Sequence, residues 1–220
     1  MTKKNAHEWR PCPLGRHWVR TYPRHLKSGK ITIVDGHCCD NRSKKDQIYS
    51  DELNLIADTF FDKLSGLPKS SSEWFPNSNK FDKYILGWCK YWNEIFNPET
   101  PLDADLIKAL IASESSFKGQ GYARGLMQIT DATQKILCDE KGELSDHLIN
   151  VNQKDLTNPN LNIAAGIRWL FRKKEIASSK LKREATWMET IMSYKGCRDI
   201  NDNPMQKFLK LYKGLKNEKN

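Results

Sequence analysis

Glu114 is the residue of this 220-residue chain whose position best suits acid–base chemistry. It follows Ile107, Leu110 and Ile111 at the i, i+3, i+4 and i+7 spacing that puts four side chains on one stripe of a helix. Burial disfavours the charged form of a carboxyl group, which then holds its proton to higher pH, as a general acid must. The alternatives are a buried glutamate paired with a lysine or arginine, or one that reaches solvent at the helix end.

Residues 1–49 hold a second group of side chains suited to chemistry, because cysteine and histidine are common zinc ligands. Four of them could hold a structural tetrahedral zinc ion between two strands: Cys12, His17, His37 and Cys38. Their Cys-x4-His and His-Cys spacings are not those of a standard zinc finger, so these residues could instead pack and cover the surface. The six cysteines also lack the spacing of a small disulfide scaffold.

Helices must position Glu114, because apolar residues recur at a 3.6-residue spacing from residue 50 onward. Capping residues at their starts, and glycine or proline after their ends, delimit the segments. The predicted helices cover about 50–65, 81–96, 103–114, 131–138, 160–177, 183–195 and 204–216.

The first 49 residues have a different character. Two runs rich in β-branched and aromatic residues, 18–22 and 30–34, flank a turn at 25–29 and predict a small β-hairpin. The expected fold class is therefore mainly α. An irregular, hairpin-containing N-terminal appendage over residues 1–49 precedes a helical domain over residues 50–220.

Composition excludes several classes of protein. A hydrophobic fraction of 38% with 7 Trp, 7 Tyr and 8 Phe argues against a disordered chain. No run of about 18 apolar residues is present, so no transmembrane segment is expected, and the N-terminus lacks the apolar region of a Sec signal peptide.

Charge is uneven along the chain, whose net charge is +9. Residues 1–49 carry 11 Lys and Arg against 4 acidic residues, residues 50–164 carry 11 against 17, and residues 165–220 carry 14 against 6. The basic segments at the two ends of the chain could bind a polyanion, such as teichoic acid, nucleic acid or an anionic membrane face. Alternatively, their charges could simply form a solvated surface. The cations are scattered and no nucleic-acid motif accompanies them, so nucleic acid is not an expected partner.

Four motifs occur in order over residues 102–215, about half of the chain. They are Glu-Ser-Ser-Phe at 114–117, Gly-Leu-Met-Gln-Ile at 125–129, Asn-Ile-x-x-Gly within 158–170, and Ser-Tyr-Lys-Gly at 193–196. Together they resemble the catalytic domain of the soluble lytic transglycosylases, which has a helical fold like that of goose-type lysozyme.

The resemblance implies cleavage of peptidoglycan between N-acetylmuramic acid and N-acetylglucosamine. Glu114 would act as general acid and then base, without a cofactor. The substrate's N-acetyl group would assist the departure, and the muramic C6 hydroxyl would then close a 1,6-anhydro ring. Only one enzymic carboxylate is needed.

The resemblance also implies which residues bind the sugar. These are Ser115, Gly125, Met127, Gln128, Ile129 and Tyr194. Ser115 would help to orient the site, Gly125 would allow close sugar approach or a positive φ, and the Tyr194 hydroxyl would reach Glu114. The alternative interpretations are that Ser115 is a plain serine at a helix end, that Met127 packs in the core, and that Tyr194 is an ordinary half-buried tyrosine.

The chain departs from the family pattern at two places. Lys195 stands where the family usually has asparagine, which places a cation near the acid; it would act on Glu114 or bind carboxylates of the peptide stem. The segment between Glu114 and Gln128 is shorter than in many transglycosylases, which predicts a trimmed subsite loop.

Two alternative functions stay open. A second carboxylate that positions water would make the enzyme a hydrolytic muramidase, and Asp131 is the candidate, although it is more typical of a helix N-cap. A non-catalytic glycan-binding module of the same fold is the other alternative, favoured only by Lys195.

Peptidoglycan as substrate places the action in the periplasm or cell wall. Without a Sec signal, the chain would be delivered by a dedicated secretion machine as an antibacterial effector, be released through phage lysis, or form part of a larger polypeptide. An effector would be matched by an immunity protein that covers the cleft at Glu114, so such a protein or a secretion component is an expected partner.

Overall fold

The computed structural model describes residues 7–42, 45–71, 75–118, 124–140 and 142–217. Within these ranges the chain is mainly helical, which confirms the expected fold class. The helices are α1 (Ser50–Phe60), α2 (Asp82–Phe96), α3 (Ala104–Ser115), α4 (Asp131–Leu137), α5 (Pro159–Leu181), α6 (Trp187–Lys195) and α7 (Asn203–Asn217). Short 3-10 turns occupy Phe61–Lys63, Ser78–Phe81 and Asp155–Thr157. Among the described helices, none is long and apolar enough to cross a membrane.

Local signals explain where the central helices begin and end. The Asp103 side chain caps α3 by accepting a hydrogen bond from the Asp105 backbone N–H at 3.0 Å, as its place before the apolar run predicts. Asn97 and Ser116 adopt left-handed φ values of 41° and 51° and end α2 and α3. The Thr186 and Glu189 capping box begins α6.

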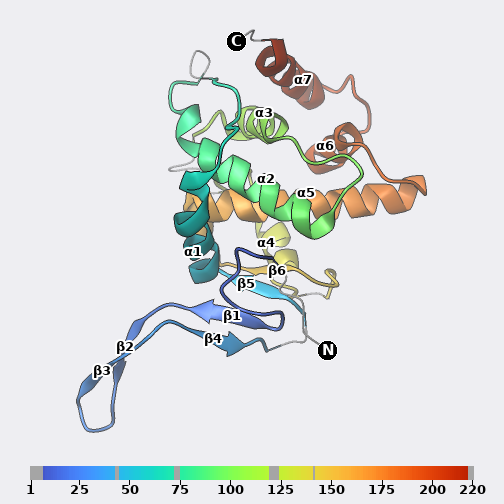
Figure 1. Ribbon diagram of the computed structural model, residues 1–220. Coiled ribbons are helices and arrows are strands. Elements are labelled where there is room, and N and C mark those ends of the chain that lie inside the picture. The colour runs from blue at the N-terminus through green and yellow to red at the C-terminus, as the bar shows by residue number, and fades with distance from the viewer. Residues whose placement is uncertain (1–6, 43–44, 72–74, 119–123, 141, 218–220) are drawn as a thin grey trace.

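The core lies around α5, which runs across the middle of the molecule, with α2 and α6 packed against it (Figure 1). Two tryptophans of α2, Trp88 and Trp92, are fully buried against this helix. Their indole N–H groups donate to the Asn160 side chain at 2.7 Å and to the Ala164 carbonyl at 3.3 Å. The polar edge of each ring is therefore satisfied inside the core, as burial requires.

The N-terminal strands form a longer ribbon than the sequence predicts. Strand β1 (Arg16–Val19) pairs with β4 (His37–Asp40), and β2 (Tyr22–His25) pairs with β3 (Ile31–Val34), both antiparallel. The predicted turn at 25–29 is confirmed, but the run 18–22 is split between two strands, and Trp18 pairs with Cys38 instead of a residue of 30–34. The outer part of the ribbon points away from the helices (Figure 1).

A short parallel pair joins distant segments, and the sequence analysis missed it. Strand β5 (Gln47–Tyr49), directly before α1, pairs with β6 (Leu148–Asn150). Ile48, Leu148 and Ile149 are buried there. Three-residue strands almost a hundred residues apart leave no periodic signal, so only the packed structure reveals the pair. The boundary between residues 49 and 50 remains a prediction, with β5 in contact with both sides of it.

Cys12 and Cys38 form a disulfide bond, with their Sγ atoms 1.98 Å apart. This corrects the zinc prediction, because a disulfide sulfur is not the thiolate that zinc requires. The two predicted histidine ligands also have other contacts: His17 Nδ1 lies 2.9 Å from Asn41 Oδ1, and His37 Nδ1 lies 2.8 Å from the Asp35 carbonyl. In this structure the bond ties the segment before β1 to β4.

Candidate active site

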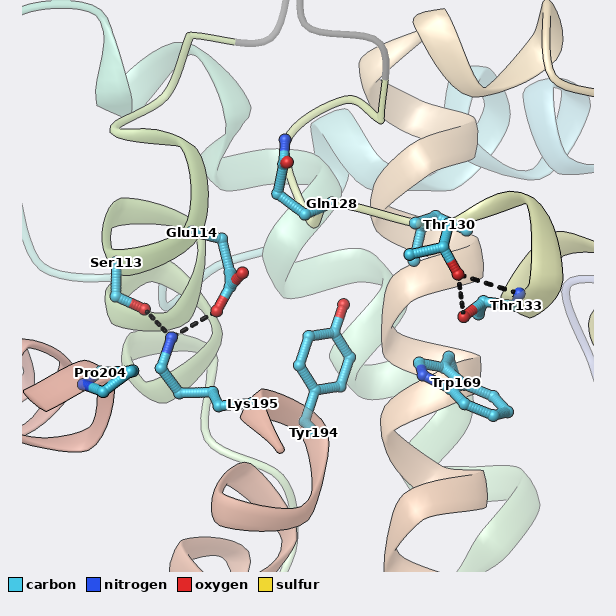
Figure 2. Close-up of a pocket in the computed structure, with 10 residues that line it drawn as sticks. Ser113, Glu114, Gln128, Thr130, Thr133, Trp169, Tyr194, Lys195 and Pro204 are labelled. Carbon is cyan, nitrogen blue, oxygen red and sulfur yellow. Dashed lines mark hydrogen bonds and ion pairs between the residues drawn. The ribbon is translucent and has the colours of Figure 1, made fainter. Parts of the chain in front are cut away.

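A pocket of about 300 Å³ opens where the end of α3 meets α4, α5, α6 and the start of α7 (Figure 2). Its walls come from segments more than 90 residues apart in the sequence. The lining residues are Ser113, Glu114, Gln128, Ile129, Thr130, Thr133, Trp169, Tyr194, Lys195 and Pro204.

Glu114 lies in the last turn of α3, at the end of the predicted apolar stripe. Ile107, Leu110 and Ile111 are fully buried, whereas the Glu114 side chain keeps 20% of its surface exposed. Glu114 therefore lies at the point where the buried stripe reaches the pocket, and its carboxyl group is part of the pocket wall. Among the described residues that line the pocket, Glu114 is the one carboxylate.

Lys195, the last residue of α6, holds this carboxylate. Its ammonium contacts Glu114 Oε1 and donates to Ser113 Oγ at 3.0 Å, with only 4% of the side chain exposed. Lys207 of α7 donates to the Ser113 backbone carbonyl at 3.0 Å. The lysine-paired glutamate that the sequence left open as an alternative therefore occurs here, on the wall of a pocket.

Figure 2 shows how this ion pair leaves part of the acid free. One carboxyl oxygen of Glu114 faces Lys195, and the other points toward the side of the pocket where Gln128 and Tyr194 lie. The second oxygen is therefore the one that can meet a bound ligand.

Tyr194 does not use its hydroxyl as the sequence predicts. The hydroxyl donates to the Met127 backbone carbonyl at 2.6 Å, and not to Glu114. Burial, the larger cause, and the nearby negative charge of Glu114, the smaller one, together raise the pKa of Tyr194 well above its ordinary value. The phenol therefore stays protonated and fixes the backbone of the turn that carries Gln128.

Asn162 of α5 holds the Gly-Leu-Met-Gln turn against the core. Its Oδ1 accepts from the Met127 N–H at 2.8 Å, and its Nδ2 donates to the Arg124 and Leu156 carbonyls at 3.1 and 3.0 Å. Met127 is fully buried, so the core-packing alternative describes its side chain. A Cβ on Gly166 would lie 2.3 Å from the Met127 sulfur, which explains the glycine of the Asn-Ile-x-x-Gly motif.

Gln128 and Ile129 line the pocket, as predicted. Gln128 has a left-handed φ of 55°, and its Nε2 donates to the Gly125 carbonyl at 2.7 Å. Gly125 itself has φ +67°, as predicted, but it is not among the lining residues. Within the segment between Glu114 and Gln128, where a trimmed subsite loop is predicted, residues 119–123 lie outside the described residues.

Ser115 and Asp131 lie away from the pocket lining. Ser115 is buried, and its hydroxyl donates to the Ile111 carbonyl at 3.2 Å, so it is the helix-end serine of the alternative interpretation. Asp131 is exposed at the first position of α4. The N-cap is Thr130, which accepts from the Thr133 N–H at 3.2 Å, so the N-cap role expected for Asp131 is wrong by one residue.

Sequence reasoning missed five lining residues: Ser113, Thr130, Thr133, Trp169 and Pro204. Trp169 carried a usable signal in its residue type, a large aromatic on the helix predicted at 160–177. In the structure it is the partly exposed position in a run, 160–170, that is otherwise buried. A tryptophan ring left open on a core helix is a stacking surface. The other four are small residues whose types and spacing give no such signal.

Gly125 offers a test of the turn. Replacing Gly125 with alanine should destabilise the fold by more than about 2 kcal/mol and lower activity, because φ is positive and the new Cβ would lie 2.1 Å from Asn162 Nδ2. Gly142→Ala is the matched control, since Gly142 has φ +69° but nothing within 4 Å, and should cost only about 1 kcal/mol. Thermal unfolding measures both; equal losses would contradict the role given to Asn162.

A comparison with protein families gives one match. The model described as "Transglycosylase SLT domain" matches residues 93–208, just over half of the chain. This range contains Glu114, the Gly-Leu-Met-Gln turn, the Asn162 motif and Tyr194. No curated protein and no solved structure matched the chain in the other two comparisons.

Proposed function

We propose, from the premise that this chain belongs to the transglycosylase SLT domain family, that it cleaves the bond between N-acetylmuramic acid and N-acetylglucosamine in peptidoglycan. The family is one of peptidoglycan-cleaving transglycosylases. The observation that carries the finer proposal is that Glu114 is the single carboxylate among the described residues of the pocket lining, held at one oxygen and open at the other. No cofactor is required for this chemistry.

The first step is departure of N-acetylglucosamine. The free oxygen of protonated Glu114 gives its proton to the glycosidic oxygen as the bond to muramic C1 breaks. The carbonyl oxygen of the substrate's own N-acetyl group forms a new bond to C1 and replaces the leaving oxygen. Glu114 is left as a carboxylate beside the Lys195 ammonium, which stabilises the charge that develops there.

The second step closes the ring. The Glu114 carboxylate takes the proton of the muramic C6 hydroxyl, whose oxygen bonds to C1 and displaces the acetamido oxygen. Glu114 ends protonated, ready for another cycle, and the product carries a 1,6-anhydro end without any addition of water. One carboxylate therefore does both proton transfers.

The pocket favours this lytic outcome over hydrolysis. Glycosidases that use two carboxylates hold them within about 10 Å of each other across the scissile bond. Asp131, the candidate for a second acid, is exposed on α4 and is not among the residues that line the pocket. Trp169, Gln128 and the Thr130–Thr133 pair then supply the stacking and polar surfaces for the sugars.

Mass spectrometry of products from purified sacculi tests the proposal. We expect muropeptides with anhydro ends, one water lighter than hydrolysed ones, and no reducing muramic ends. Reducing ends would make the enzyme a hydrolytic muramidase. No soluble product, with sacculi still bound, would favour the non-catalytic glycan-binding module that Lys195 alone suggests.

Lys195 provides a prediction about positioning. Lys195→Met removes the ammonium but keeps the length of the side chain, so kcat should fall about 10-fold to 100-fold with little change in KM, because Glu114 loses its anchor. Lys207→Met is the matched control, since Lys207 contacts the Ser113 carbonyl and not the acid, and should keep kcat within about threefold.

Steady-state digestion of soluble glycan strands separates the roles of Lys195. If Lys195 acts by placing a positive charge beside Glu114, Lys195→Arg should have a higher kcat than Lys195→Met. A higher KM with unchanged kcat would show instead that Lys195 binds carboxylates of the peptide stem.

We further propose that the protein acts in the periplasm or cell wall as an antibacterial effector, with an immunity protein that covers the pocket at Glu114. The pocket lining, which includes Gln128 and the partly exposed Glu114, offers polar groups to such a partner. Expression in a bacterial host with an added export signal should cause lysis, whereas cytoplasmic expression should not. Equal growth in both cases would contradict this role.

A further inference from the structure

The outer half of the N-terminal ribbon, residues 20–34, is an unusual surface; we name it the outer ribbon. It consists of β2, β3 and their turn, and residues 20–33 are all exposed. In Figure 1 it extends away from the helices. Of the seven exposed large apolar side chains in the described part of the chain, four lie here: Tyr22, Leu26, Ile31 and Ile33.

These apolar side chains lie on both faces of the ribbon. Ile31 pairs with His25 and Ile33 pairs with Pro23, so both isoleucines share one face; they are 61% and 62% exposed. Tyr22 and its partner Val34 lie on the opposite face, because successive residues of a strand alternate. Both faces of the ribbon therefore expose apolar side chains to solvent, whereas an ordinary surface hairpin has one polar, solvated face.

The charges of the outer ribbon have one sign. Its four charged residues are Arg20, Arg24, Lys27 and Lys30, all exposed, and the segment contains no aspartate or glutamate. Lys27 and Lys30 lie at the turn, where the Leu26 N–H donates to the Lys30 carbonyl at 2.8 Å. Lys27 and Lys30 are thus close in sequence to Ile31, whereas Arg24 lies on the same face as Tyr22. Arg20 forms an ion pair with Asp51 of α1 at 3.6 Å.

We propose that the outer ribbon binds the surface of an anionic lipid bilayer. Arg24, Lys27 and Lys30 attract lipid phosphates, and Ile31, Ile33 and Leu26 enter the boundary between headgroups and acyl chains. The free edges of a two-stranded ribbon carry backbone N–H and C=O groups that hydrocarbon cannot satisfy. Binding therefore stops at the headgroup level, where water and phosphate meet these groups.

A bilayer fits this surface better than a protein partner does. A stable protein interface buries about 800 Å² on each side, usually from one continuous face. The outer ribbon has eight strand residues and divides its apolar side chains between two faces. A fluid surface can surround both faces at once, and a basic segment without acids matches its negative charge. This inference does not depend on the proposed catalytic function.

Co-sedimentation of the full chain with lipid vesicles tests it. The parent should bind phosphatidylglycerol vesicles at low salt, and at least about tenfold more weakly to phosphatidylcholine vesicles. The double variant Ile31→Ser, Ile33→Ser should bind phosphatidylglycerol at least about tenfold more weakly than the parent. The control Leu181→Ser, Ile200→Ser removes apolar side chains that are 44% and 43% exposed elsewhere, and should bind as the parent does.

A parent chain that does not bind phosphatidylglycerol vesicles, or a double variant that binds them as well as the parent, would overturn the proposal. A concentration-dependent dimer that the double variant abolishes, without lipid binding, would show a second copy as the occupant and would also overturn it. Unfolding temperature and sacculus digestion should be unchanged in the double variant. If the parent chain itself does not digest sacculi, that result would contradict the proposed function only, and the lipid-binding result would still stand.

Discussion

Glu114→Gln should lower the rate of glycan cleavage about 100-fold to 10,000-fold, because an amide of the same shape has no acidic proton to give to the glycosidic oxygen. Release of soluble muropeptides from purified sacculi measures the rate. The substitution also removes the partner of Lys195, so thermal unfolding and sacculus binding must show that the variant is folded.

Asp131→Asn is the matched control for Glu114→Gln. It also converts a carboxylate to an amide, but at an exposed position that does not line the pocket, so the rate should stay within about twofold of the parent. Full activity in the Glu114 variant would contradict the mechanism. A large loss in the Asp131 variant would indicate a second carboxylate and a hydrolytic reaction.

Arg10→Met should destabilise the fold by about 3 to 5 kcal/mol, because it leaves two buried carboxylates without their cation. Arg10 is fully buried; its Nη1 lies 2.5 Å from Asp46 and its Nε lies 2.8 Å from Glu52. Glu52 also accepts from the Trp18 backbone N–H at 3.1 Å, so this cluster joins the ribbon to α1. Urea unfolding measures the loss.

The pKa values of the two carboxyl groups in this cluster shift in opposite directions. Burial raises the pKa of Glu52 above its ordinary value, despite the opposing charge of Arg10. Burial acts in the same direction on Asp46, but hydrogen bonds and charges from His147 and Arg10 outweigh it and hold the pKa of Asp46 below its ordinary value. Asp46 keeps His147 as a partner in the variant, at 3.1 Å, whereas Glu52 loses its cation. Glu52 can then avoid an unpaired buried charge only by taking up a proton, so the loss in Arg10→Met should be smaller at pH 5 than at pH 8.

Arg16→Met is the control for Arg10→Met. Arg16 also pairs with an aspartate, Asp40, at 2.8 Å, but both side chains are largely exposed. An exposed pair contributes at most about 1 kcal/mol. Equal losses in the two variants would show that the buried cluster does not hold the N-terminal segment to the helices.

The sequence by itself determined the fold class, the approximate helix ranges and the candidate acid. These depend on spacing within one segment, because burial of one face of a helix imposes a 3.6-residue period that is visible along the chain. Glu114 lies at the end of such a stripe, and Asp103 caps the same helix where it was expected. The positive φ of Gly125 was one of the two roles that the family resemblance implied for it, and it is likewise a local property of the backbone.

The tertiary structure alone decided which side chains meet. Lys195 contacts Glu114 across 81 positions, Tyr194 donates to Met127 across 67, and Cys12 is bonded to Cys38 across 26. Such contacts depend on how helices and strands pack, and packing leaves no period in the sequence. The order of residues therefore supplied the acid. The packing of α6 against α5 and α7, which brings Lys195 to the end of α3, supplied the cation that holds it.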